Sequence, residues 1–304
     1  MTVKNLKNAA ISIRQKLLNK ANAENRTFNE VLQYYCMERF LYRLSVSPHA
    51  DKFILKGALM LRVWQAPEIR PTMDIDMLGR TGSDLENITA LVREICELDI
   101  ADGDGLVFDG KQIAGEQITE DAGYPGLRIR IPAMLDTAVL KVQMDIGFGD
   151  AVYPEPQKYL FPVLLNSPVP SLLCYSRESA IAEKFEAMLK RGKLNSRMKD
   201  FYDVWLLAGQ YDFDGSQLCA AVRWTLERRN VNLPEQITAF SDEFIEYKRV
   251  QWNAFRKKLK NVSAPEHFAE PVAMIKDFLT PVIETLSTGK PMPKHWQASG
   301  PWQY

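Results

Sequence analysis

Two aspartates separated by one residue, Asp74 and Asp76, are the feature of this sequence with the clearest chemistry. They lie near the end of the segment FILKGALMLRVWQAPEIRPTMDIDML, which runs from residue 53 to residue 78. Side chains at positions i and i+2 of a strand point to the same face, and Ile75 between them points to the other. Adjacent carboxylates repel each other unless a cation lies between them, and an oxygen-only pair suits Mg²⁺. The pattern predicts a metal-binding strand, although a lone pair of this kind is also common at a solvated strand edge.

A glycine precedes this strand in a position that suits phosphate binding. The run Lys56-Gly57-Ala58 ends an apolar, strand-like stretch and opens a segment with a helical pattern. The N-terminus of a helix offers free N–H groups and a positive dipole end to a phosphate, and glycine lets the ligand approach closely. We therefore predict that residues 56–58 hold a triphosphate, the simpler alternative being that the glycine only marks a turn. A phosphate-binding turn followed by a metal-binding pair of aspartates is what nucleotidyl transfer requires.

A third carboxylate, Asp145, lies in the alternating segment VLKVQMDIGFGD. The alternation predicts a strand in which Asp145 leaves the apolar face together with Lys141 and Gln143. Alone it would be read as an exposed strand residue. With the two upstream aspartates we predict that it joins them as a ligand of the metal.

Three segments together resemble the AbiEii/AbiGii-type toxin family of toxin–antitoxin systems, within the DNA polymerase beta-like nucleotidyltransferase superfamily. They are FILKGALMLRVW with RPTMDIDMLGR, then LKVQMDIGFGD, then ESAIAEKFEAMLKRGKLNSRMKDFYDVWLL, and they cover about residues 50 to 210. The last segment is the most specific. Two features depart from the pattern: Ala58 stands where such enzymes often have Ser or Gly, and the gap before Asp74 is longer than in many members.

The resemblance implies an enzyme that moves a nucleoside monophosphate from an NTP to a hydroxyl and releases pyrophosphate, with two Mg²⁺ ions as cofactors. It implies that Asp145 completes the metal triad and accepts the proton of the attacking hydroxyl. Lys184 would contact the nucleotide phosphates, and Asp200, with Asp203 as second choice, would be the acidic residue that supports the active site. The implied acceptor is an RNA, the 3′ end of a tRNA, with growth arrest as the consequence and a neighbouring antitoxin protein as the control.

Several alternatives stay open. Lys184 lies on an amphipathic helical segment, where a lysine is normally just solvated, and Asp200 or Asp203 would also suit a loop cap or a pair with Arg197. The acceptor could be a protein or a small molecule. The alternative to an enzyme is a binding module that keeps the same fold, contacts RNA or protein and has no catalytic activity. Ala58 is the one residue that favours it.

Composition narrows the class of protein. The chain has 304 residues, of which 46% are hydrophobic and 25% charged, as in an ordinary globular protein. Neither a continuous apolar run of about 18 residues nor an N-terminal signal core is present, so we expect a cytoplasmic protein without a membrane partner. The three histidines lie far apart, which argues against a histidine metal site. The four scattered cysteines predict buried free thiols: Cys36, Cys96, Cys174 and Cys219.

The charges cancel overall but are unevenly distributed. Residues 65–160 carry eighteen acidic and eight basic side chains, whereas residues 177–261 carry sixteen basic and twelve acidic ones. The densest basic cluster is Lys248-Arg249 with residues 256–260, RKKLK. Such a run is either a solvated helix face or a contact for RNA.

The predicted fold class is α/β (α+β): a nucleotidyltransferase core with a small mixed sheet, N-terminal helices and a mainly helical C-terminal domain. The capping box Thr27-x-x-Glu30 predicts a helix that continues to about Leu44. A proline-rich passage at 154–170 suggests the domain boundary. The predicted parts are N-terminal helices at 1–50, the core at 51–170, the helical domain at 171–286 and a loose tail at 287–304.

Overall fold

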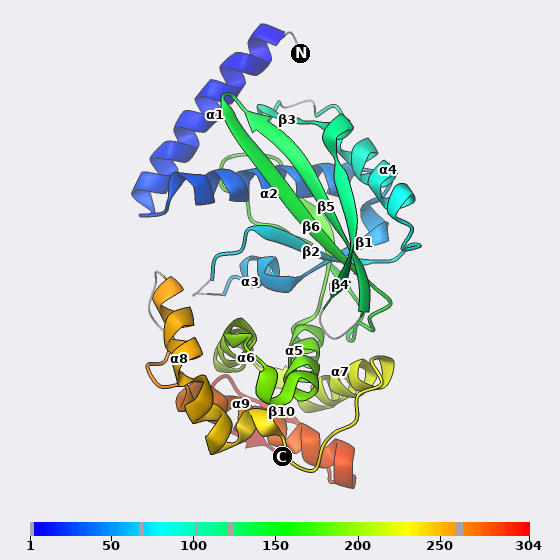
Figure 1. Ribbon diagram of the computed structural model, residues 1–304, viewed down its shortest axis with the longest axis vertical. Helices are drawn as coiled ribbons and strands as arrows, with labels where there is room; N and C mark the ends of the chain where they lie inside the picture. The colour runs from blue at the N-terminus through cyan, green and yellow to red at the C-terminus, as the bar shows by residue number, and fades with distance from the viewer. Residues whose placement is uncertain (1–2, 67–69, 101–102, 121–123, 260–263) are drawn as a thin grey trace. The chain divides into compact units, whose positions relative to one another are not determined.

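The computed structural model describes residues 3–66, 70–100, 103–120, 124–259 and 264–304 (Figure 1). They group into two compact units, and each is described by itself. The first unit takes in Met1–Trp64, Thr72–Gly149 and Gln157–Cys174. The second takes in Gln65–Pro71, Asp150–Pro156 and Tyr175–Tyr304.

In its described residues the first unit combines four helices with an eight-stranded sheet. Its helices, within the described residues, are α1 (Val3–Ala23), α2 (Phe28–Val46), α3 (Met60–Val63) and α4 (Leu85–Cys96). Its strands are β1 (Phe53–Lys56), β2 (Asp74–Gly79), β3 (Leu106–Phe108), β4 (Ala114–Glu120), β5 (Tyr124–Leu135), β6 (Ala138–Phe148), β7 (Gln157–Leu160) and β8 (Ser171–Cys174).

The sheet is mixed, in the order β3-β5-β6-β2-β1-β8-β7, with β4 paired to β5 as well. Strand β2 runs parallel to β6 and antiparallel to β1. Strands β5 and β6 form a long antiparallel hairpin that stands out in Figure 1. The order matters because it places β2 directly beside β6, although about sixty residues of chain separate them.

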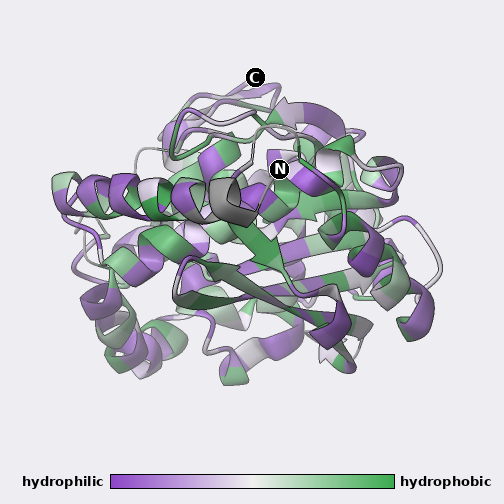
Figure 2. Cartoon of the chain, turned by 90° about the horizontal axis from the view of Figure 1, so that it is seen from above, coloured by the Kyte–Doolittle hydropathy of each residue, from purple (hydrophilic) through white to green (hydrophobic). Residues whose placement is uncertain are grey.

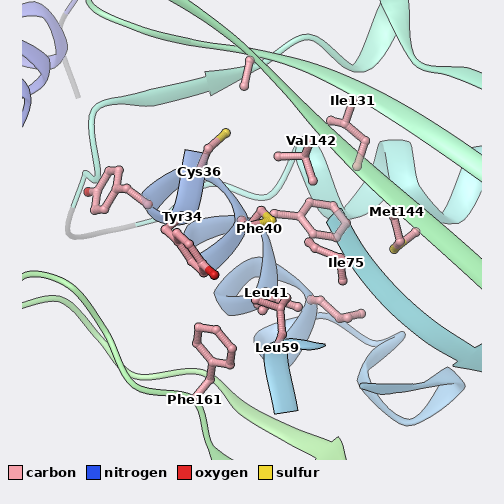
Figure 3. Packing of buried hydrophobic residues seen from close by; sticks show 14 of the residues in the cluster. Tyr34, Cys36, Phe40, Leu41, Leu59, Ile75, Ile131, Val142, Met144 and Phe161 are labelled. Carbon is pink, nitrogen blue, oxygen red and sulfur yellow. The ribbon is translucent and has the colours of Figure 1, made fainter. Parts of the chain in front are cut away.

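Helix α2 forms the centre of the core of this unit. Almost every residue from Val31 to Leu44 is buried, which is unusual for a helix and explains its weak amphipathic pattern. Figure 3 shows Phe40 and Leu41 of α2 lying with Ile75 of β2, Ile131 of β5, and Val142 and Met144 of β6. The inward faces of these strands are therefore occupied by α2, and their other side chains face away from it.

The second unit is mainly helical. Its helices are α5 (Arg177–Arg191), α6 (Met198–Gln210), α7 (Gly215–Arg228), α8 (Asp242–Lys258) and α9 (Ala269–Thr288). Three two-residue strands form a small sheet in the order β11-β10-β9: β9 (Phe213–Asp214), β10 (His295–Trp296) and β11 (Trp302–Gln303). Within the described residues, none of the helices has both the length and the apolar character needed to cross a membrane.

Several expectations from the sequence are met. The side chain of Thr27 accepts a hydrogen bond from Glu30 N and caps α2, as the capping box predicts. All four cysteines are buried free thiols. The N-terminal segment is a helix, and in Figure 2 hydrophilic and hydrophobic bands alternate along it.

The prediction of a loose tail at 287–304 is wrong. Helix α9 continues to Thr288, and the residues after it form β10, which pairs with β9, and β11, which pairs with β10. Trp296 is buried there, packs on Phe278 and Trp302, and donates its indole N–H to Ala208 O at 2.8 Å. The prolines that suggested a loose tail instead flank two short strands, because tertiary packing of the tryptophans fixes them.

The two units also divide the chain differently from the four predicted parts. The buried helix α2 shares its core with the sheet, so the N-terminal helices belong to the first unit. Two short segments, Gln65–Pro71 and Asp150–Pro156, group with the helices of the second unit. Contacts between residues distant in sequence decide this division, and composition does not report them.

Candidate active site

Asp74, Asp76 and Asp145 come together on one face of the sheet. Asp76 lies directly opposite Asp145 in the parallel pair of β2 and β6, and Asp74 lies opposite Gln143. One carboxylate oxygen from each of the three aspartates lies within 4.8 Å of the others. Because strand residues two apart share a face, the register alone brings the three side chains to the same side of the sheet. The structure thus unites the three carboxylates that the sequence predicts as a group.

Gly57 lies directly against the side chain of Asp76. Lys56 is paired with Asp76 across β1 and β2, and Gly57 follows with a φ of +72°. A Cβ at position 57 would lie 1.9 Å from Oδ2 of Asp76. The glycine is therefore required both by its backbone conformation and by the closeness of the carboxylate.

A chain of hydrogen bonds from α2 holds Asp74. The hydroxyl of Thr72 donates to Oδ1 of Asp74 in a short hydrogen bond, and Thr72 N donates to the Tyr34 hydroxyl at 3.1 Å. Two guanidinium groups lie over the Tyr34 ring, that of Arg62 at 3.9 Å and that of Arg26 at 5.0 Å from its centroid. The cation–π contacts help to hold the ring whose hydroxyl accepts the hydrogen bond from Thr72.

Asp145 is held by a basic residue that the sequence does not single out. Arg128 on β5 lies opposite Asp145 and makes two hydrogen bonds to its carboxylate, at 2.8 and 2.7 Å. Gln143 adds a longer contact of 3.4 Å. The hydrogen bond to Asp145 raises the pKa of Arg128. The alternation of residues 127–131 shows that Arg128 faces outward, but only the strand register shows that it faces Asp145.

The three carboxylates fit a hard divalent cation. Their donors are all oxygen atoms, two of the side chains are half-buried and Asp145 is buried. Glycine at position 57 leaves room beside Asp76 that any side chain would fill. Within the described part of the chain, this is the one group of at least three acidic, histidine or cysteine residues with ligand atoms close enough to share an ion.

The helical segment that the sequence predicts after Gly57 is present and short. A 3₁₀ turn (Gly57–Leu59) leads into α3, which ends at Val63. The dipole of a helix grows with the number of aligned peptide units. An element as short as this one therefore offers a ligand its free N–H groups rather than a strong dipole. Lys56 is buried at the end of β1, where it is paired with Asp76, and Ala58 is buried two residues further along the chain.

Lys184, Asp200 and Asp203 form a separate cluster within the second unit. The Lys184 ammonium donates to Asp200 at 3.1 Å and to Asp203 at 2.7 Å. Arg70 makes two hydrogen bonds to Asp203, at 2.8 and 2.9 Å, and Arg197 donates to Asp200 at 2.5 Å. The pair of Asp200 with Arg197 is the simpler alternative that the sequence left open. Helices α5 and α6 are thus joined by a network of five charges.

The pKa values in this cluster reflect strong mutual stabilisation. Burial raises the pKa of Asp203, but the charges of Arg70 and Lys184 outweigh it and hold that pKa well below its ordinary value. Burial likewise raises the pKa of Asp200, and Lys184 and Arg197 reverse the effect. Burial lowers the pKa of Lys184, yet the two aspartates leave it above the ordinary value. All three groups are therefore charged at neutral pH.

The basic cluster on α8 is only partly available to a ligand. Lys248 is buried, with its ammonium over the rings of Tyr247 and Phe244 at 4.7 and 5.5 Å. Lys260 lies outside the described residues. The RNA contact suggested by this run therefore cannot include Lys248.

Comparison with solved structures identifies the class of the fold. One is described as a "putative nucleotidyltransferase from H. pylori"; it is 15% identical, has a TM-score of 0.51 and covers 86% of this chain and 99% of its own. JHP933 from Helicobacter pylori is 14% identical, with a TM-score of 0.52, and covers 86% of this chain and 97% of its own. At such identities the likeness concerns the fold. A search of curated proteins gave no match.

The fold and its acidic strands define a nucleotidyltransferase. A family model described as "Nucleotidyl transferase AbiEii toxin, Type IV TA system" matches residues 39–274. The chain belongs to this AbiEii nucleotidyltransferase toxin family. Membership in a toxin–antitoxin family implies an antitoxin as its functional partner, as the motifs led us to expect.

Proposed function

We propose that this toxin transfers a nucleoside monophosphate from an NTP to a hydroxyl of an RNA, with the 3′ end of a tRNA as the first acceptor to test. The observation that carries the proposal is the convergence of Asp74, Asp76 and Asp145 within 4.8 Å on one sheet face. The choice of acceptor follows from the resemblance of the sequence motifs to the family. Modified tRNA in the cytoplasm would arrest growth, which is the effect expected of a toxin.

Magnesium is the ion that we propose for the three carboxylates, since hard oxygen donors suit it. Bound there, it would offset the negative charge that develops on the phosphoryl oxygens during transfer. The contribution of the chain is to hold the ligands ready. Thr72 orients Asp74, Gly57 makes room for Asp76, and Arg128 orients Asp145.

The reaction forms one bond and breaks one. The acceptor hydroxyl oxygen attacks the α-phosphorus of the NTP, and the bond to the oxygen bridging the α- and β-phosphates breaks, so that pyrophosphate leaves. The hydroxyl proton passes to a carboxylate oxygen of Asp145, acting as general base. The guanidinium of Arg128 holds that carboxylate in a fixed orientation through two hydrogen bonds.

For the triphosphate we propose the turn at Lys56, Gly57 and Ala58, and the resemblance of the motifs to the family suggests a phosphate contact for Lys184 as well. The turn supports this role because Lys56 is paired with Asp76 across the strands and Gly57 lies against the Asp76 carboxylate. The support for Lys184 is its charge at neutral pH, with Asp200 as the residue that positions its ammonium.

The test is a labelling assay with purified protein, Mg²⁺, each α-³²P-labelled NTP in turn, and total RNA or total protein as acceptor. We expect label on tRNA, and a loss of at least about 10²-fold with Asp76→Asn, since this removes one charge from the site. The control is Asp51→Asn, an exposed aspartate of the same unit. Label on protein or a small molecule would redirect the proposal to that acceptor. No label with any NTP or fraction would overturn it in favour of a silent binding module.

A further inference from the structure

The β5–β6 hairpin has one face that the core does not use. Alternate side chains such as Ile129, Ile131 and Val142 point inward and are buried. The intervening residues point outward by the two-residue period of a strand. We call this side the outer face of the hairpin; its main side chains are Arg128, Arg130 and Met134 on β5, and Val139, Lys141 and Asp145 on β6.

The outer face begins at the catalytic carboxylates. Asp76, Asp145 and Arg128 are opposite one another in register across β2, β6 and β5, so they form one row on the same side of the sheet. From Arg128 to Met134 the face continues along the hairpin for about 20 Å, at about 3.4 Å per residue. A chain-like ligand that ends at Asp145 could therefore lie along the hairpin.

The charge of the face suits a polyanion. Arg128, Arg130 and Lys141 occupy three successive rows, about 7 Å apart, leading away from Asp145. Lys141 is exposed, and Arg130 pairs with the exposed Glu116. Such a surface pair contributes at most about 1 kcal/mol, so a phosphate can compete for the guanidinium. Successive cations at this spacing can follow the phosphates of a nucleic-acid strand.

The far end of the face is apolar. Val107, Met134 and Val139 are opposite one another across β3, β5 and β6, with 57%, 50% and 79% of their surface exposed. A duplex would offer phosphates to this row, whereas an unpaired strand offers the flat faces of its bases. Methionine sulfur also makes favourable contacts with aromatic rings. Basic rows followed by an apolar row therefore fit a single strand better than a duplex.

We propose that the outer face of the hairpin binds the unpaired end of the RNA acceptor and leads its terminal hydroxyl to Asp145. This inference rests on the proposed function and adds where the acceptor lies. Lys141 and Arg130 bind phosphates, while Val139 and Met134 contact bases further from the terminus.

Two exposed positions allow a test that leaves the fold intact. Lys141→Glu and Val139→Asp are compared with Lys158→Glu and Leu160→Asp, both on the edge strand β7, where Leu160 is 67% exposed. Binding is measured by fluorescence anisotropy with a 5′-fluorescein-labelled pool of total tRNA, without NTP, at several salt concentrations. The KM for NTP is measured in parallel, and a thermal unfolding transition verifies that each variant folds.

We expect the Kd for tRNA to rise about tenfold in Lys141→Glu and in Val139→Asp, with a smaller salt slope for the lysine variant. The KM for NTP and both control variants should stay as in the wild type. Unchanged tRNA affinity in both hairpin variants, or no tRNA binding by the wild type, overturns the inference. If RNA is labelled normally by these variants, the proposed function stands and only the surface is wrong. If the wild type binds tRNA at this face but labels no RNA, the proposed function is what fails.

Discussion

Gly57 and Asp76 show how closely the candidate site depends on single atoms. The glycine has a φ of +72°, and the position of its missing Cβ coincides with the carboxylate of Asp76. From the sequence, Gly57 is expected to admit a phosphate. In the structure, Gly57 makes room for the side chain of Asp76, and phosphate binding would be a second role for it.

Gly57→Ala is expected to abolish transfer because the new methyl group must displace the Asp76 carboxylate. The positive φ adds a backbone cost of about 1–2 kcal/mol. Chemical denaturation and the labelling assay measure the two effects separately. Gly289→Ala is the matched control, because Gly289 has a φ of +73° and open space around its Cβ position. It should lose similar stability and retain activity; equal activity of the two variants would contradict the role of Gly57.

At the scale of elements, buried charges join α5 to α6. Lys184 on α5 contacts Asp200 and Asp203 on α6, and Arg70 reaches Asp203 from the segment before β2. Asp203 is buried and fully compensated, so removing one partner leaves an unpaired charge. The cluster therefore stabilises the helical unit whether or not Lys184 also contacts a nucleotide.

The lowered pKa of Asp203 predicts loss of stability in acid. An acid whose pKa is depressed by folding stabilises the folded state fully above its ordinary pKa of about 4, and the contribution is lost as pH falls below that value. We expect the free energy of unfolding to fall below about pH 4. Asp203→Asn should reduce that dependence and cost about 3 kcal/mol at pH 7. Denaturation at several pH values measures both, with the exposed Asp277→Asn on α9 as control. An unchanged acid profile in Asp203→Asn would contradict this assignment.

At the scale of the whole molecule, ligand binding and folding are linked. The formal net charge is zero, but the first unit concentrates three carboxylates in one place, and Arg128 pairs with one of them, Asp145. A cation that binds the folded site and not the unfolded chain adds stability by mass action. The acidic site is therefore expected to make the stability of the protein depend on metal.

Addition of Mg²⁺ is expected to raise the melting temperature of the wild type. At a concentration of 100 Kd the gain is about 2.7 kcal/mol, and a chelator should reverse it. Asp76→Asn should lose most of this gain, whereas Asp51→Asn should keep it. Differential scanning calorimetry measures the shift without reference to activity. The same rise in wild type and Asp76→Asn would show that the ion binds elsewhere.

The sequence by itself determined the local chemistry. Alternation in DIDML and in LKVQMDIG, the capping box at Thr27 and the helical periods after residue 177 all report short-range preferences, which a residue carries with it. For the same reason the three carboxylates, the mixed fold class and the family resemblance could be predicted from the sequence. What failed, the loose tail, depended on packing that those preferences do not encode.

Only the tertiary structure decided which residues meet. The pairing of Arg128 with Asp145, the packing of Gly57 against Asp76 and the path from Tyr34 through Thr72 to Asp74 all join positions distant in sequence. Strand register sets such contacts, and a shift of one residue would send every side chain to the other face. The register is specified by burial of the inward face against α2, a property of the assembled core and of no single segment.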